Sequence, residues 1–408
     1  MKILFLAYDG LTDPLGQSQV IPYMVGLANL GHEVTIVSTE KKSGKNEVEA
    51  ISEHLRSNKI KWHSISYTKN PPVLSTLYDC FKLLLLTRRL CRKENFDIVH
   101  CRSYIPALIG IHLQKNFKLK FIFDMRGFYA DERIDGRIWK QHIILYRILY
   151  RFFKRQEFRF LSHADYTICL TERAKTEILG WSIIPDQPIP IKVIPCCTNM
   201  NEFDPGSFDK EKKKQLRSKL GFEESDFILM YSGAIGTWYM LDEMFDFFKR
   251  LIIRRPAKFL FITYDEPENI LQVARGKNID TELIRIVRAR HIEVPAILSI
   301  CDLSIFFIRP LYSKMASSPA KQGEIMSMGI PIICNSNIGD SDRIITEAEG
   351  GIIIRSFAKE DYDFVAGEIP ELLSRSKEKI RQTAMQYFSL SRGVQNYDEV
   401  YKSLAKEH

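Results

Sequence analysis

MKILFLAYDGLTDPLGQSQVIPYMVGLANLGHEVTIVS, residues 1–38, is the stretch from which the fold class follows. It begins with an apolar run typical of a buried strand and passes through a turn-rich loop at residues 9–18. A helix is predicted over residues 19–30, where Gly31 ends it, and residues 33–38 form a second apolar strand. This strand, loop, helix, strand order predicts one unit of a parallel α/β sheet.

The loop after the first strand carries two glycines, Gly10 and Gly16, the second at the point where the predicted helix opens. Their separation does not fit a GxGxxG pattern, so the loop does not indicate a dinucleotide cofactor. A plain strand-to-helix turn is the alternative to a ligand-binding loop here.

The same alternation of apolar strands and helical segments continues along the whole chain. In the first half, strands are expected at residues 60–65, 97–101, 120–123, 166–170 and 192–195. In the second half, they are expected at residues 227–232, 258–263, 284–288, 303–307, 330–335 and 351–354. This pattern predicts two doubly wound parallel sheets.

Proline-rich residues 185–205 are predicted to link the two halves. The domains are therefore expected at 1–195 and 196–385, facing each other, with 386–408 as a separate terminal segment. Within that segment, a helix over residues 393–405 has one apolar face and is expected to cross back and pack on the first domain.

Composition restricts the class of protein. The chain has 408 residues, 45% of them hydrophobic, and a net charge of +8, which suits two or three soluble domains and is too mild to indicate nucleic-acid binding. Its eight cysteines lack CxxC or Cys/His ligand spacing, which predicts reduced core residues and no metal site. With no signal-type segment and no apolar run near the ~20 residues that cross a bilayer, we expect a cytoplasmic protein.

A second informative stretch, SSPAKQGEIMSMGIPIIC at residues 317–334, leads from a polar loop into a short helix and an apolar strand. Ser317 and Ser318 are predicted to start the helix, so that their hydroxyls and the free backbone N–H groups converge with Lys321 on a bound anion. Glu324 lies one turn further on and can hold a ribose diol. The alternative is an ordinary helix cap with a solvated Lys–Glu pair.

This stretch resembles the donor-nucleotide motif of glycosyltransferase family 4, in which two glutamates are separated by seven residues. Glu324 matches the second glutamate, whereas Ala316 stands in place of the first. A branch of the family with a Lys-x-x-Ser-Ser-Pro-x-Lys-x-x-Glu run is more similar, here Lys314 to Glu324. The resemblance covers nearly the whole chain and implies the GT-B fold of two Rossmann-like domains.

Further matches lie on both sides of the interdomain link. Residues 193–199 resemble the segment that follows the crossing, with Cys196 and Cys197 in place of Asn-Gly. Residues 231–236 resemble the first loop of the second domain, but Ala234 replaces the arginine that normally clamps the diphosphate, and Met240 stands near the lysine position. Substitute cations are therefore needed, because a leaving diphosphate must be neutralised.

The resemblance and the local chemistry together give the candidate donor-binding residues. They are Gly16, Gly233, Arg309, Lys314, Ser317, Ser318, Lys321 and Glu324. Arg309 follows an apolar strand, where open parallel sheets place ligand-binding groups, although it can also be a structural cation on a loop.

In the first domain, Asp124 occupies the position of a family histidine that contacts the transferred sugar, and Arg126 follows it. We expect Asp124 to bind sugar hydroxyls and Arg126 to bind phosphate or acceptor, so the two are catalytic candidates together with Lys321; a local Asp–Arg brace is the alternative. Gln17, His100 and Arg102 are acceptor-side candidates, and His100 can also be a satisfied strand-end histidine.

The resemblance implies a retaining, metal-independent transferase that moves a sugar from a nucleotide-sugar donor to a glycan or lipid-linked acceptor in bacterial surface-polysaccharide synthesis, without a cofactor. An epimerase of the same fold and a catalytically silent scaffold are the alternatives. Residues 77–93 and 139–160 combine cations with apolar side chains, which fits peripheral binding to the anionic inner face of the cytoplasmic membrane or amphipathic helices with basic outer faces.

Overall fold

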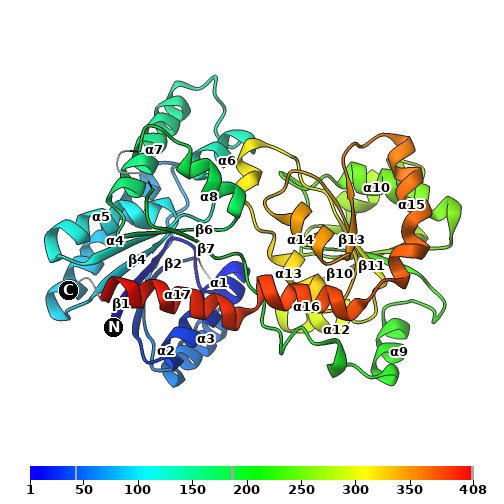
Figure 1. The fold of residues 1–408 in the computed structure, drawn as a ribbon, viewed down its shortest axis with the longest axis horizontal. Helices are drawn as coiled ribbons and strands as arrows, with labels where there is room; N and C mark the ends of the chain where they lie inside the picture. Colours follow the sequence, from blue (N-terminus) through cyan, green and yellow to red (C-terminus); the bar gives the residue numbers. More distant parts are fainter. Residues whose placement is uncertain (42–43, 185–187, 406–408) are drawn as a thin grey trace. The chain divides into compact units, whose positions relative to one another are not determined.

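The computed structural model describes residues 1–41, 44–184 and 188–405, and it divides into two compact units. The first unit comprises Met1–Pro195 with Leu390–His408, and the second comprises Cys196–Ser389 (Figure 1). Each unit contains one parallel sheet with helices packed around it, so the predicted pair of doubly wound sheets is confirmed. Residues 185–187 of the predicted link lie outside the described residues.

The sheet of the first unit has seven parallel strands in the order β3-β2-β1-β4-β5-β6-β7. They are β1 (Lys2–Ala7), β2 (Glu33–Glu40), β3 (Lys61–Ser66), β4 (Ile98–Arg102), β5 (Lys120–Asp124), β6 (Tyr166–Cys169) and β7 (Ile191–Val193). The register places Ile3 between Val34 of β2 and Ile98 of β4. Strand order therefore reverses between β1 and β4, and the carboxyl ends of these two strands are the expected place for a ligand.

The helices of the first unit are α1 (Pro14–Gln19), α2 (Ile21–Asn29), α3 (Lys45–Ser57), α4 (Leu74–Lys93), α5 (Tyr104–Phe117), α6 (Tyr129–Asp135), α7 (Ile144–His163), α8 (Glu172–Leu179) and α17 (Leu390–Ala405). The helix expected over residues 19–30 is α2. The correction is the short helix α1, which lies in the predicted loop and is separated from α2 by Val20, whose φ is −125° and ψ is −62°. Pro14 starts α1 because its fixed φ suits a first turn. Gly31, with φ +90°, ends α2 as predicted.

Helix α17 belongs to the first unit and lies beside α2 (Figure 1). A Cβ on Gly26 of α2 would lie 2.5 Å from Val394, so the glycine permits the two helices to approach closely. His32 Nε2 also lies 2.9 Å from Asp398 Oδ1. The terminal helix thus packs on the first unit, and it starts at Leu390 rather than at residue 393.

The sheet of the second unit has six parallel strands in the order β10-β9-β8-β11-β12-β13. They are β8 (Ile228–Ser232), β9 (Lys258–Ile262), β10 (Ile284–Val287), β11 (Leu303–Phe306), β12 (Ile332–Asn335) and β13 (Gly351–Ile354). The order reverses between β8 and β11, which makes their carboxyl ends the corresponding ligand position in this unit.

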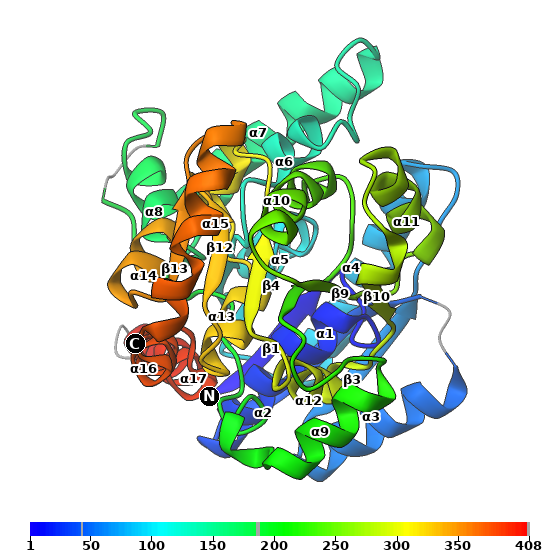
Figure 2. The same ribbon diagram turned by 90° about the vertical axis from the view of Figure 1, so that its right-hand side faces the viewer.

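The helices of the second unit surround its sheet (Figure 2). They are α9 (Lys210–Lys219), α10 (Leu241–Arg254), α11 (Pro267–Gly276), α12 (Val294–Leu298), α13 (Ala320–Ser327), α14 (Ser341–Glu347), α15 (Lys359–Ser374) and α16 (Lys377–Phe388), with short 3-10 turns η1 (Pro205–Ser207), η2 (Thr281–Leu283), η3 (His291–Glu293) and η4 (Tyr312–Ala316). Helix α16 continues through Phe388, so this unit ends later than the boundary expected at residue 385.

The core of the second unit is rich in aromatic residues. Phe259 and Phe261 of β9 have ring centroids 4.2 Å apart, and Phe245 of α10 packs on both. Fully burying one such side chain contributes about 1.5–3 kcal/mol. This core fixes the sheet from which the loops of the candidate site project.

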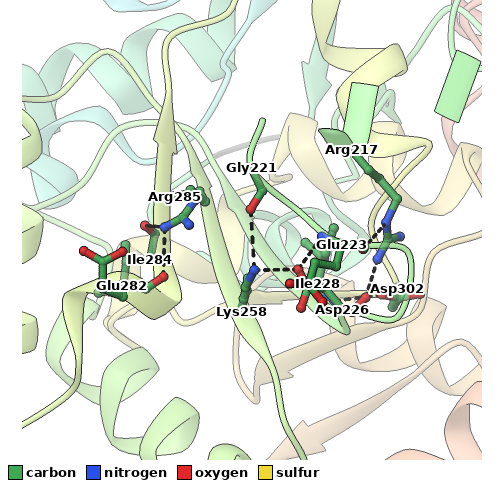
Figure 3. A network of polar contacts seen from close by, with 10 residues as sticks. All are labelled: Arg217, Gly221, Glu223, Asp226, Ile228, Lys258, Glu282, Ile284, Arg285 and Asp302. Atoms are coloured by element: carbon green, nitrogen blue, oxygen red, sulfur yellow. Dashed lines mark hydrogen bonds and ion pairs between the residues drawn. The ribbon is translucent and has the colours of Figure 1, made fainter. Parts of the chain in front are cut away.

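At the amino-terminal edge of the same sheet, polar groups brace the starts of the strands (Figure 3). Arg217 Nη1 donates to the carbonyl oxygen of Ile300 at 3.0 Å, and its other nitrogens donate to the carbonyls of Glu223 and Asp226. Lys258 Nζ pairs with Asp226 Oδ2 at 2.6 Å. These charges are satisfied inside the unit and hold the sheet together.

Candidate functional site

The carboxyl ends of β8 and β11 carry the first group of candidate residues. Gly233 directly follows β8 with φ +117°, a backbone conformation that favours glycine. The loop that it begins folds over the end of β11, where Tyr239 pairs with Ile308 and Arg309 N donates to Trp238 O at 2.9 Å. The predicted positions of Gly233 and Arg309 at a strand-end site are therefore brought together at the reversal point.

The loop after β8 is held by side chains rather than left open. Asp265 Oδ2 accepts hydrogen bonds from Ile235 N at 2.5 Å and from Thr263 Oγ1 at 2.9 Å. The Tyr231 hydroxyl donates to Ala234 O at 2.5 Å. This bracing keeps the backbone at Gly233 in a fixed position.

Lys321 of α13 reaches this loop from the other side. Its ammonium lies 4.2 Å from the ring centroid of Tyr231 and 3.8 Å from that of Tyr239. A Cβ on Gly233 would lie 2.9 Å from Lys321 Nζ, so the lysine tip occupies the space that glycine leaves. The side chain is buried, and Nζ has no hydrogen-bond partner among the residues that the structure describes.

Burial lowers the pKa of Lys321 to about 7, against a smaller opposite effect of the Glu324 carboxylate. Contact with two aromatic faces stabilises a cation, but it does not fill the three donors of an ammonium. Lys321 is therefore a buried, unsatisfied cation beside a glycine loop. An anion with several acceptor oxygens, such as a phosphate, complements it.

Glu324 lies one turn from Lys321 on α13, and His291 of η3 is its partner. His291 Nε2 is 3.1 Å from Glu324 Oε1, and the hydrogen bond raises the pKa of His291 against the effect of burial. Sequence reasoning missed His291. It follows β10, so the rule that ligand groups gather after parallel strands could have drawn attention to it.

Ser317 and Ser318 do not start a helix, which corrects the prediction made for them, and the alternative of an ordinary helix cap does not apply either. Helix α13 starts at Ala320, its N-cap residue is Pro319, and no side chain caps it. The Ser318 hydroxyl instead accepts a hydrogen bond from Cys196 N at 3.2 Å. The reason is that Pro319, with φ −66° and ψ 113°, keeps an extended backbone and delays the helix.

The two other candidate cations of this unit differ in exposure. Lys314 is buried, and its Nζ lies 3.5 Å from the ring centroid of Trp238. Arg309 is exposed, and its backbone pairs with the same tryptophan. Trp238 therefore lies next to both cations, although the sequence had not singled it out.

In the first unit, the loop after β1 is closed by Glu40 at the end of β2. The Glu40 carboxylate accepts from Leu11 N at 2.8 Å, from Thr12 N at 3.1 Å and from the Thr12 hydroxyl. A Cβ on Gly16 would lie 2.2 Å from Gly10 O, so this glycine is required by close approach of the backbone. Two N–H groups of the expected phosphate-type loop are thus already paired with a carboxylate.

Gln17 follows Gly16 on α1 and points its side-chain amide at the protein. Its Nε2 donates to Thr12 O at 3.2 Å and to Glu47 Oε1 at 3.1 Å. The residue is exposed, so these contacts brace the start of α1 without burying the amide.

Asp124 ends β5 and is buried against the terminal helix. Its Oδ2 accepts from the Tyr397 hydroxyl at 3.0 Å and lies 3.4 Å from His100 Nε2, while His100 Nδ1 lies 2.7 Å from the Tyr401 hydroxyl. Burial lowers the pKa of His100, which favours a neutral ring that donates to Asp124 and accepts from Tyr401. His100 is thus a satisfied strand-end histidine, the alternative recognised from the sequence.

Asp124 also has charged neighbours. Burial alone would raise the pKa of its carboxyl, but Arg126, His100 and Arg102 lower it below the ordinary value. Arg126, whose φ is +59°, places Nη1 3.9 Å from Asp124 Oδ1. That oxygen is buried and accepts no hydrogen bond from the described residues. Arg102 ends the neighbouring strand β4 and is buried as well.

Comparison with known proteins bears on each unit. Residues 23–202 match the family profile of Glycosyltransferase Family 4. This part of the chain is similar to glycosyltransferase family 4. A relative from Bacillus anthracis, N-acetyl-alpha-D-glucosaminyl L-malate synthase, is 20% identical over 96% of this chain and 95% of its own length.

Solved structures of low sequence identity share the fold of this chain. A glycosyltransferase from Rickettsia africae superposes with a TM-score of 0.72 at 17% identity, covering 100% of this chain and 99% of the other. Anabaena HepE in complex with UDP-glucose superposes with a TM-score of 0.70 at 13% identity, covering 99% of this chain and 100% of the other. The GT-B fold class is thereby confirmed.

The chain departs from the pattern of family 4 where the sequence indicated, and the structure places other groups there. Ala316 is buried at the end of η4, Ala234 offers its carbonyl to Tyr231, and Met240 precedes α10. The tip of Lys321 lies beside Gly233, in the loop that carries Ala234 and Met240 in place of the family's two cations. The tyrosines that contact Lys321, Asp124 and His100 carried no motif that could have revealed their roles.

Proposed function

We propose that this chain is a glycosyltransferase that binds a nucleotide-sugar donor at the carboxyl ends of β8 and β11 and transfers the sugar to an acceptor bound by the first unit. One observation carries the proposal: the unpartnered, buried ammonium of Lys321 beside Gly233 at the strand reversal of the second sheet. The bound UDP-glucose named for Anabaena HepE, a protein of the same fold, supports a donor of this class.

In this proposal, Lys321 binds the donor diphosphate and neutralises the charge that develops as it leaves. Glu324, whose position His291 fixes at 3.1 Å, accepts hydrogen bonds from the ribose hydroxyls. Arg309 is exposed at the same strand end and adds a second cation to the phosphates. Donor binding would then restore the proton that burial makes Lys321 hold weakly.

We further propose retention of anomeric configuration without a metal ion, as the family resemblance implies. The bond from the anomeric carbon to the diphosphate breaks, and a bond from that carbon to the acceptor oxygen forms on the same face. The acceptor proton passes to an oxygen of the leaving diphosphate. Asp124 would bind hydroxyls of the transferred sugar through Oδ1, the buried oxygen that accepts no hydrogen bond from the described residues.

The proposed acceptor is a glycan or a lipid-linked molecule of bacterial surface-polysaccharide synthesis, used at the inner face of the cytoplasmic membrane. In the part of the chain that the structure describes, the helices are too short or too polar to span a bilayer. Helix α4 nevertheless exposes Leu74, Leu77 and Phe81, and α7 exposes Ile144 and Ile148. These apolar side chains share their helices with lysines and arginines, which supports peripheral binding to anionic lipid.

The test is donor binding and slow donor hydrolysis with UDP-, GDP-, dTDP- and ADP-sugars, measured on wild type and on the Lys321→Ala and Glu324→Ala variants. Binding of one nucleotide with release of its diphosphate, weakened in both variants, would support the transferase. Sugar-nucleotide interconversion without an acceptor would favour the epimerase. If none of the four nucleotide-sugars binds, the donor site is refuted and the silent scaffold is favoured.

Metal independence and stereochemistry need separate measurements. Turnover should persist in excess EDTA, and the product linkage should keep the anomeric configuration of the donor. An inverted product, or activity restored only by a divalent ion, would overturn these two parts of the proposal while leaving the donor site intact.

A further inference from the structure

Arg102, the last residue of β4, has an unusual environment. Its side chain is 6% exposed, its Nε is buried without a hydrogen-bond partner, and it donates no side-chain hydrogen bond to any residue in the described ranges. A guanidinium has five N–H donors, and arginine is rarely buried unless those donors are paired. Burial and the neighbouring Arg126 guanidinium lower the pKa of Arg102, against smaller raising effects of the Asp124 and Asp9 carboxylates.

The two carboxylates that act on the charge of Arg102 form no hydrogen bond with it among the described residues. Asp124 uses Oδ2 for the Tyr397 hydroxyl and His100, and its Oδ1 lies 3.9 Å from Arg126 Nη1. Asp9, on the loop after β1, is exposed and forms no hydrogen bond with Arg102. The neighbouring groups therefore leave the donors of Arg102 unfilled.

Arg102 lies where open parallel sheets place residues that bind ligands. Strands β4 and β1 are neighbours with Arg102 paired to Ala7, and strand order reverses between them. Ligands of open parallel sheets bind outside the carboxyl ends of strands at such a reversal. Two N–H groups of the loop after β1 cannot bind such a ligand, because Leu11 N and Thr12 N already donate to Glu40.

We propose that Arg102, with Arg126 beside it, binds an anionic group of the acceptor, a phosphate or a carboxylate. This inference rests on the proposed function in assigning the acceptor to the first unit. A planar guanidinium matches either oxyanion with two parallel N–H···O bonds, which fills donors that the protein leaves open. The acceptor is then a hydroxyl compound that also carries a negative charge.

The test uses the full chain and two probes that contain no hydroxyl acceptor, inorganic phosphate and succinate, titrated calorimetrically at fixed ionic strength. Wild type should bind one probe, which decides between phosphate and carboxylate, and Arg102→Gln should weaken that binding about 10- to 100-fold. Arg102→Lys should give an intermediate loss, because it keeps the charge without the paired geometry. Arg92→Gln, on the exposed end of α4, is the matched control and should bind as wild type.

Lys321→Ala separates this proposal from the donor site, because Lys321 belongs to the other unit. Probe binding retained in Lys321→Ala and lost in Arg102→Gln would support the acceptor site even if nucleotide binding failed. Binding lost in Lys321→Ala and retained in Arg102→Gln would overturn it, as would a wild type that binds neither probe. Arg102→Met should unfold at no lower denaturant concentration than wild type in the absence of ligand; a clear loss of stability would mean that Arg102 is structural and would also overturn the proposal.

Discussion

The two edges of the second sheet treat their cations in opposite ways. At the amino-terminal edge, Arg217 donates to three backbone carbonyls and Lys258 pairs with Asp226 at 2.6 Å (Figure 3). At the carboxyl edge, Lys321 is buried against Tyr231 and Tyr239, and its ammonium lacks a hydrogen-bond partner among the described residues. Satisfied charges hold a fold together, whereas an unsatisfied buried charge is retained at a cost that binding can offset.

Exchanging Lys321 for methionine should have the largest effect on ligand binding at the carboxyl edge. Lys321→Met should weaken nucleoside diphosphate binding about 100-fold, because it removes a charge-assisted contact to phosphate. The free energy of unfolding should not fall, since methionine fills the same apolar space without an unpaired amine. Calorimetric titration and urea unfolding measure the two effects, and an unchanged affinity would contradict the assigned role.

The opposite edge should respond in the opposite way to Arg217→Met. Three carbonyls lose their donor, so the free energy of unfolding should fall by about 2 kcal/mol. Nucleotide affinity of the folded protein should stay within about twofold of wild type, because no ligand group changes. A variant that is fully stable but binds nucleotide weakly would show that the two edges are not separated as described.

The pH dependence of the free energy of unfolding should also reveal the buried Lys321. The pKa of Lys321 is lowered to about 7 in the folded protein, so between pH 7 and its ordinary range the unfolded chain binds more protons. The free energy of unfolding should therefore rise with pH in this window, by up to about 1.4 kcal/mol per pH unit from this residue. Urea unfolding of wild type and Lys321→Met at pH 6, 7, 8 and 9 measures it, and equal slopes for the two proteins would contradict the lowered pKa.

The smallest effect is expected at His291. Its pKa is raised by the hydrogen bond to Glu324, so the contact stabilises the fold fully below the ordinary histidine pKa and less as pH rises through the folded value. His291→Gln should lower the free energy of unfolding by less than about 1 kcal/mol at pH 5.5, because the pair is partly exposed, and by less still at pH 8. A loss that grows with pH would have the wrong sign for this contact.

The strands could be predicted because both faces of a parallel sheet are buried, which produces short apolar runs. The expected strand at residues 303–307 is β11 (Leu303–Phe306), and the expected strand at 351–354 is β13 (Gly351–Ile354). Helix boundaries were less predictable. Pro319 delays α13, and α1 lies within residues that were predicted to be a loop.

The candidate site could be predicted only in part. Gly233 and Lys321 were predicted separately as site residues. The structure brings Lys321 Nζ into the space beside Gly233. His291 was missed, because its partner Glu324 lies far along the chain. Ser317 and Ser318 were predicted to start the helix that carries Lys321, but α13 starts at Ala320, after Pro319.

By itself, the sequence determined the alternation of strands and helices, the two parallel sheets and the strand ends where polar residues gather, since these depend on local apolar patterns and short-range backbone preferences. Only the tertiary structure decided which of those polar residues are satisfied. His100 is completed by Tyr401 of the terminal helix, whereas Lys321 and Arg102 are buried without a hydrogen-bond partner among the described residues. The physical reason is that the burial and the hydrogen bonding of a polar side chain depend on groups from distant parts of the chain, which cannot be predicted from the residues next to it in sequence.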